Sequence, residues 1–171
     1  MRFVKSVEQA ALGPIYRLAL WLRASAWRVH RPTLIGVRAL IIHDDAVLLI
    51  RQRHSRTHWA LPGGGVERNE RLAEAARREA REETGAIVRI DRLLGMYDRF
   101  GGGVSNYIAV FVCTPLNVDA WEGGEPRPPR SLEIAEARFF PLRRLPTGAS
   151  QGTRRRVAEY LADEAGLNRM W

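Results

Sequence analysis

The stretch GGVERNERLAEAARREAREETGA, residues 64–86, holds the pattern from which the fold can be inferred. Its glycine-rich start is typical of a loop, whereas the alanines and arginines from about Glu70 to Thr84 favour a helix. Asn69 suits the N-cap position of that helix, and Gly85 suits the left-handed turn at its end. The stretch therefore predicts a glycine loop followed directly by one helix.

Three glutamates of this helix, Glu79, Glu82 and Glu83, have i, i+3 and i+4 spacing and so share one face. Two explanations are open for them. Arg78 could neutralise the face by pairing with Glu74 or Glu82, which is the simpler reading of the helix alone. Alternatively, the carboxylates could bind a hard divalent cation such as Mg²⁺, which takes oxygen ligands.

The glycine run at 63–65 favours the cation. Consecutive glycines cost conformational entropy, and they are informative where a backbone must approach another group closely. Placed just ahead of an acidic helix, their carbonyls could complete the coordination of a cation.

At this spacing, residues 64–86 resemble the Nudix box, G-x5-E-x7-R-E-U-x-E-E-x-G-U, where U is apolar. Every fixed residue is present: Gly64, Glu70, Arg78, Glu79, Glu82, Glu83 and Gly85. Ala80 and Ala86 fill the apolar positions, where bulkier aliphatic residues are commoner. The β-rich segment before the box and the EARFFPLRRLP segment after it are also similar to the family.

The resemblance implies an α/β fold, the Nudix α/β/α sandwich around a mixed sheet, and a hydrolase. The family cleaves a nucleoside diphosphate linked to another moiety X, usually with Mg²⁺ or Mn²⁺. By resemblance, the metal ligands are Glu79, Glu82, Glu83 and the Gly63 carbonyl, and Glu79 could instead serve as, or orient, the catalytic base. Arg78 would hold the carboxylates in position, and Glu70 would tie the helix start to the loop. Gly64 and Gly85 would be structural residues of the box.

Many members of the family also use a glutamate outside the box as a base or ligand. Glu125, Glu133 and Glu136 are the candidates here, with solvated surface positions as the simpler alternative for each. Arg51 and Arg53 alternate on a predicted strand that leads to the glycine loop, so we expect one of them to contact a substrate phosphate. The substrate itself is not indicated by any subgroup motif.

The rest of the domain reads as strands and one further helix. Strands are expected at 33–43, 46–54, 86–100, 105–116 and 136–142, the first two joined by a tight Asp44–Asp45 turn, with a closing helix at 153–166 and a long polar loop at 117–131. Mostly hairpin-connected strands predict one sheet with helices packed on its faces.

The first 33 residues differ from the remainder and are predicted to be an amphipathic helical extension of a domain at 34–171. Residues 14–31 have an apolar face, but Arg17 and Arg23 make the segment too charged to span a bilayer. We expect the helix to dock on the domain or on a second subunit of a homodimer. An in-plane position on a membrane surface is the alternative, because arginines and tryptophans flank the apolar face.

Composition bounds the remaining possibilities. The chain has 171 residues, a formal charge of +8 and one cysteine, Cys113, in an apolar run. One domain, a cytoplasmic location and a buried, inert thiol are therefore expected. The positive charge suits a nucleotide-type substrate, nucleic acid or an acidic membrane surface. A nucleotide- or RNA-binding regulator without turnover is the alternative to an enzyme, although the complete set of three glutamates favours chemistry.

Overall fold

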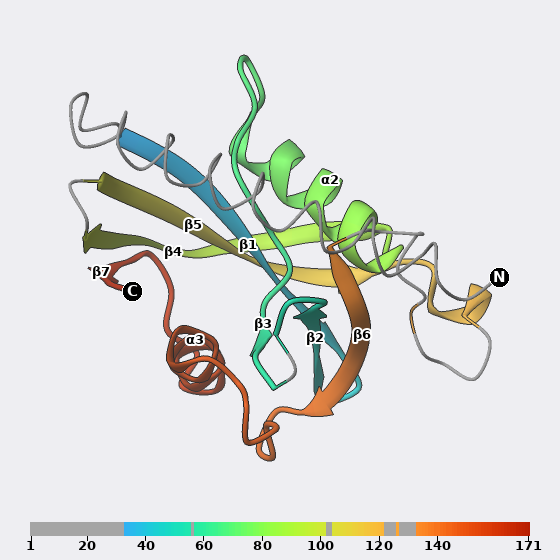
Figure 1. Ribbon diagram of the computed structural model, residues 1–171. Coiled ribbons are helices and arrows are strands. Elements are labelled where there is room, and N and C mark those ends of the chain that lie inside the picture. The colour runs from blue at the N-terminus through green and yellow to red at the C-terminus, as the bar shows by residue number, and fades with distance from the viewer. Residues whose placement is uncertain (1–32, 56, 102–103, 122–125, 127–132) are drawn as a thin grey trace, which may run out of the picture. The chain divides into compact units, whose positions relative to one another are not determined.

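The computed structural model describes residues 33–55, 57–101, 104–121, 126 and 133–171. The chain divides into two compact units, Met1–Leu34 with Phe100–Ser105 and Ile35–Arg99 with Asn106–Trp171. The second unit contains both described helices (Figure 1). The predicted helix at 14–31 and the candidate Glu125 lie outside the described residues.

Along the described chain, three strands precede the first helix, three strands follow it, and one strand comes after the second helix. The strands are β1 (Thr33–His43), β2 (Ala46–Gln52), β3 (Trp59–Ala60), β4 (Val88–Gly101), β5 (Val104–Pro115), β6 (Ile134–Pro141) and β7 (Leu167–Met170). The helices are α2 (Leu72–Thr84) and α3 (Gln151–Leu161), with a 3₁₀ turn at Val118–Ala120.

The strands form a mixed sheet in the order β3-β2-β1-β5-β4-β7, with β6 also paired to β2. The expected turn joins β1 to β2, and both Asp44 and Asp45 have positive φ, as the tight turns of hairpins require. β7 pairs with β4 in parallel, which makes the sheet mixed. The sequence did not predict β7, because the segment before it was read as the end of a longer helix. α3 ends at Leu161 rather than near residue 166.

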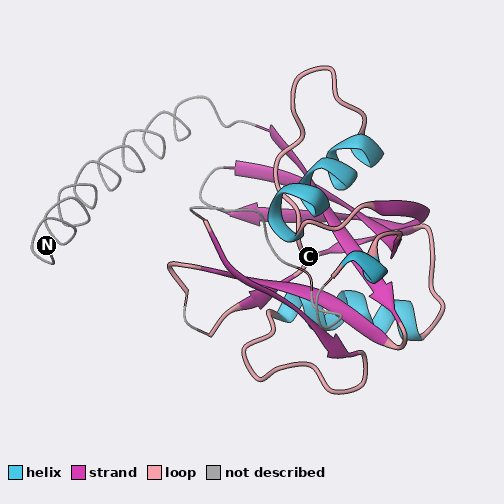
Figure 2. Ribbon diagram, turned by 90° about the vertical axis from the view of Figure 1, so that its right-hand side faces the viewer, coloured by secondary structure: helices cyan, strands magenta, loops and turns pink. Residues whose placement is uncertain are grey.

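Alternating residues of β1 separate two apolar cores. Val37, Ala39 and Ile41 pack with buried alanines of α2, whereas Leu40 belongs to the core that contains Val157 of α3. The two helices thus cover opposite faces of the sheet, as Figures 1 and 2 show. The predicted α/β/α arrangement is confirmed.

The ends of α2 show one wrong prediction and one correct one. Asn69 is not the N-cap; it has a φ of 63°, and the helix begins two residues after Glu70 with Arg71 as the capping residue. Glu74 accepts a 3.4 Å hydrogen bond from the Arg71 N–H, which satisfies a backbone donor at the helix start. Gly85 ends the helix with a φ of 76°, as predicted.

Two further expectations can be compared with the described residues. Cys113 is buried, and this burial raises the pKa of its thiol to about 12, which is the inert state expected of it. Within the described part of the chain, neither helix has the length and apolar character needed to cross a bilayer.

Candidate active site

The glycine loop lies directly on β1. The N–H of Val37 donates to the Gly64 carbonyl and the N–H of Ala39 to that of Pro62, each at 2.9 Å. Between these bonds, Gly63 has a φ of 141°, and a Cβ on it would lie 2.2 Å from the Val37 carbonyl oxygen. Glycine is therefore required at position 63 both by the backbone conformation and by the contact with β1.

Gly63 connects this loop to the acidic helix. Its N–H donates a 2.6 Å hydrogen bond to Oε2 of Glu83. Burial raises the pKa of Glu83 to about 7, against the opposing effects of this hydrogen bond and of the Arg38 charge. The negative charges of Glu79 and Glu133 also raise it. Glu83 is thus a carboxylate whose ionised form needs a positive charge nearby.

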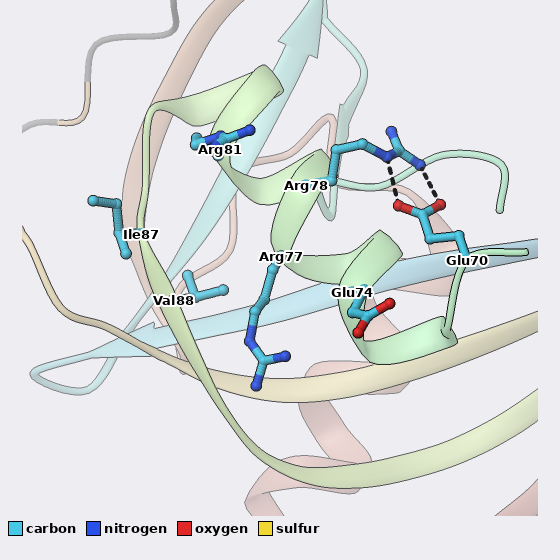
Figure 3. Close-up of a pocket in the computed structure, with 7 residues that line it drawn as sticks. All are labelled: Glu70, Glu74, Arg77, Arg78, Arg81, Ile87 and Val88. Carbon is cyan, nitrogen blue, oxygen red and sulfur yellow. Dashed lines mark hydrogen bonds and ion pairs between the residues drawn. The ribbon is translucent and has the colours of Figure 1, made fainter. Parts of the chain in front are cut away.

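Arg78 is the centre of a network on the same helix. Its guanidinium donates to both oxygens of Glu70, at 2.8 and 3.0 Å, a two-pronged pair visible in Figure 3. It also contacts Glu79 at 2.8 Å and Glu82 at 3.3 Å. The Arg78–Glu82 pair considered from the sequence is therefore present, whereas Glu74 caps the helix instead of pairing with Arg78. Hydrogen bonds from Arg78 and from the Glu67 N–H hold the pKa of Glu70 below its usual value.

The hollow in Figure 3 lies between α2 and the start of β4. It has a volume of about 490 Å³ and is lined by Glu70, Glu74, Arg77, Arg78, Arg81, Ile87 and Val88. The three glutamates of the acidic face are absent from this lining. We therefore place the candidate active site at the glycine loop rather than in this hollow.

The donor set suits a hard divalent cation. Three carboxylates come from one helical face. The Glu79 carboxylate lies against Gly64, because a Cβ on Gly64 would be 2.6–2.9 Å from the carboxylate atoms of Glu79. In the observed rotamers, the carboxylates of Glu79 and Glu82 form ion pairs with Arg78 and do not point to one common position. Accordingly, no three acidic, histidine or cysteine side chains of the described residues converge on one ion position.

The Gly63 carbonyl, expected as a further ligand, has a partner that the sequence analysis missed. It accepts a hydrogen bond from Nη1 of Arg38, on β1. Burial lowers the pKa of Arg38, while the charges of Glu83 and Glu79 raise it. The signal for this residue was available, since Arg38 is a cation in the otherwise apolar run TLIGVRALIIH.

The candidate glutamates outside the box differ in their surroundings. Glu133 lies near enough for its charge to raise the pKa of Glu83. Glu136 instead accepts from Arg51 at 2.9 Å, and Arg51 also lies over the Trp59 ring at 5.8 Å. Of Glu133 and Glu136, the two candidates within the described residues, Glu133 is the one that acts electrostatically on the acidic helix.

Arg53 does not lie on the strand on which it was expected beside Arg51. β2 ends at Gln52, and the pairing with β6 shifts register between Arg51 and Gln52, which interrupts the alternation of side chains. The Arg53 N–H donates to the Glu133 carbonyl at 2.8 Å, so its backbone positions that glutamate.

The sequence matches the family model described as the NUDIX domain over residues 32–161. The chain belongs to the Nudix family. It is 31% identical over 124 residues to an ADP-ribose pyrophosphatase of Methanocaldococcus jannaschii, covering 70% of this chain and 69% of that one. It is 37% identical over 79 residues to diphosphoinositol polyphosphate phosphohydrolase 2 of Rattus norvegicus, a match that covers 46% of this chain and 44% of that one.

The Nudix assignment agrees with solved structures. A crystal structure of an ADP-ribose pyrophosphatase from Streptococcus suis is similar with a TM-score of 0.61 and 26% identity, covering 81% of this chain and 98% of that one. The chain thus spans nearly all of this structure but less than half of the rat relative.

Proposed function

We propose that this Nudix protein hydrolyses the diphosphate linkage of a nucleoside diphosphate joined to another group X. Water attacks one phosphorus, the bridging oxygen leaves with the other phosphate, and the products are a nucleoside monophosphate and phosphorylated X. The observation that carries the proposal is the position of Glu83, a partly buried carboxylate held by the Gly63 N–H on the same helical face as Glu79 and Glu82.

Glu79, Glu82 and Glu83 would hold Mg²⁺ or Mn²⁺ on this face, with the Gly63 carbonyl as a further candidate. When bound, the cation supplies neutralisation of the pyrophosphate charge and a lower pKa of the attacking water. Glu70 holds the guanidinium of Arg78 in place, and the contacts of Arg78 with Glu79 and Glu82 would keep these two carboxylates on one side of the helix.

Glu133 is the candidate base for the attacking water, because its charge acts on Glu83 from the segment just before β6, outside the acidic helix. Glu79 is the alternative base. The pairing of Glu136 with Arg51 makes Glu136 a weaker candidate and gives Arg51 a structural role. ADP-ribose is the first substrate to test, since two relatives carry ADP-ribose pyrophosphatase in their names.

The test is release of nucleoside monophosphate from ADP-ribose, nucleotide sugars, nucleoside triphosphates and dinucleoside polyphosphates, with and without Mg²⁺ or Mn²⁺. We expect metal-dependent turnover that Glu83→Gln lowers by roughly 100-fold or more, as removal of a group that stabilises charge in the transition state does. Asp119→Asn is the matched control, because Asp119 is exposed and distant in sequence from the box.

An unimpaired Glu83→Gln variant would refute the assignment of the site. Binding of nucleotides or RNA by the wild type without any turnover would support the regulatory alternative instead. Such binding should weaken steeply with salt if it depends on the net charge of +8.

A further inference from the structure

A cavity of about 300 Å³ lies on the α3 side of the sheet, between the start of α3 and β1. Its charged and polar lining includes Arg38, His58, Arg99 and the first residues of α3, and Trp171 forms an aromatic wall. Hydrogen bonds of 2.8 and 2.9 Å between Trp59 and the segment before α3 fix one side of the cavity. Its volume is at the lower end of the range for ligand pockets, about 300–1,000 Å³.

The cavity adjoins the acidic site through a single residue. Arg38 lines the cavity and donates to the Gly63 carbonyl, while the Gly63 N–H donates to Glu83. A substrate with its diphosphate at the glutamates would therefore have its next chemical group within reach of this cavity.

The described side chains that line the cavity include two arginines and no carboxylate. Arg38 and Arg99 come from β1 and β4. Burial lowers the pKa of Arg38, the charges of Glu83 and Glu79 raise it, and the nearby charge of Arg99 lowers it. Among the described residues, neither arginine has a carboxylate within ion-pair distance, and Arg99 makes no side-chain hydrogen bond. Two neighbouring cations destabilise each other unless an anion lies between them.

Arg38 has a structural function, because it holds the glycine loop. That function uses one of the five N–H donors of a guanidinium and leaves the others available. The structural function of Arg38 does not explain why a second arginine, Arg99, lies exposed at the rim of the same cavity. A bound anion accounts for both arginines, since guanidinium groups suit phosphate and carboxylate.

We propose that this cavity binds an anionic group, a phosphate or a carboxylate, that the substrate carries in X beyond the diphosphate that is cleaved. Arg38 and Arg99 contact the anion, and Trp171 packs against the adjoining part of X. The inference rests on the proposed function for the identity of the substrate, but the binding of an anion in the cavity can be tested separately.

The binding test uses inorganic pyrophosphate as the probe, titrated calorimetrically into the full chain in metal-free buffer. We expect Arg99→Gln to weaken the affinity roughly tenfold, as loss of one charge-assisted contact does. Arg143→Gln, which removes the same charge from an exposed turn, should change it less than twofold. Equal affinities for the two variants, or no binding to the wild type, would overturn the proposal.

The kinetic test compares UDP-glucose with UDP-glucuronate, which differ by one carboxylate in X. We expect wild type to have the higher kcat/KM for UDP-glucuronate, and Arg99→Gln to lower the ratio of the two values several-fold. An unchanged ratio would count against the cavity as an anion site. If neither compound nor any other nucleotide is hydrolysed, the proposed function fails, while the pyrophosphate titration still decides whether the cavity binds an anion.

Discussion

Gly63 donates its N–H to Glu83 at 2.6 Å while its carbonyl accepts from Arg38 on the neighbouring strand. One glycine thus joins the acidic helix, the loop and the sheet. Because the carboxylate is already held by the backbone, its position does not depend on a ligand. The loop glycines therefore matter for geometry at the site as well as for the turn itself.

Gly63→Ala should destabilise the protein. The added Cβ would meet the Val37 carbonyl at 2.2 Å in a backbone conformation that alanine rarely adopts. We expect a loss of roughly 2–4 kcal/mol in the free energy of unfolding, measured by urea denaturation. Gly65→Ala is the control, because a Cβ at Gly65 meets nothing within 4 Å. Similar stabilities for the two variants would show that the loop does not lie on β1 as described.

The raised pKa of Glu83 predicts a pH dependence of stability in metal-free buffer. The folded state keeps this carboxyl protonated up to a pKa of about 7, whereas in the unfolded chain it ionises near 4.5. Its favourable contribution is therefore complete below pH 4.5 and is lost as the pH rises to about 7. Between pH 5 and 8, wild type should lose stability relative to Glu83→Gln, which has no such group. Parallel stability–pH profiles of the two proteins would contradict this.

The sequence predicted the parts of this site that depend on local spacing. The acidic face of α2 and the stop at Gly85 follow from helical periodicity and from the conformation that glycine allows. Arg38 and Arg99 were not predicted as partners in one cavity, because they line it together only once β1 and β4 are placed on either side of β5 in the sheet. β7 was missed for a similar reason, since its four residues are stabilised by pairing with β4 rather than by any strong pattern of their own.

Replacing Arg78 by lysine should impair the site although the charge is kept. Lysine cannot reproduce the two parallel bonds to Glu70 while also reaching Glu79. We expect a loss of about 1–3 kcal/mol in stability and at least a tenfold fall in kcat for the substrate identified in the panel. Arg77→Lys is the control, because Arg77 is exposed and forms no ion pair with the described residues. Equal kcat values for the two variants would remove Arg78 from its proposed positioning role.

A second charged cluster stabilises the opposite face of the sheet. Arg156 is only 1% exposed and donates to both oxygens of Glu159, at 2.6 and 2.8 Å. Its guanidinium also lies 3.7 Å from the centre of the Tyr97 ring, and the Tyr97 hydroxyl donates to Glu159 at 2.8 Å. Arg156 and Glu159 of α3 thus both contact Tyr97 of β4. Because the two charges are buried, each is stabilised by the other and not by water.

Glu159→Ala should therefore lower the free energy of unfolding by more than an ordinary surface ion pair contributes to it. It leaves the buried Arg156 without its counter-charge, for which roughly 3–5 kcal/mol is typical. The double variant Arg156→Met/Glu159→Ala should recover part of this loss, because no uncompensated charge remains in the core. The exposed pair Arg89–Asp91, at 2.8 Å, is the comparison, and Arg89→Met should cost less than about 1 kcal/mol. Urea denaturation of Glu159→Ala, Arg156→Met, the double variant and Arg89→Met measures these differences. A double variant as unstable as the sum of its single variants would show that Arg156 and Glu159 act independently.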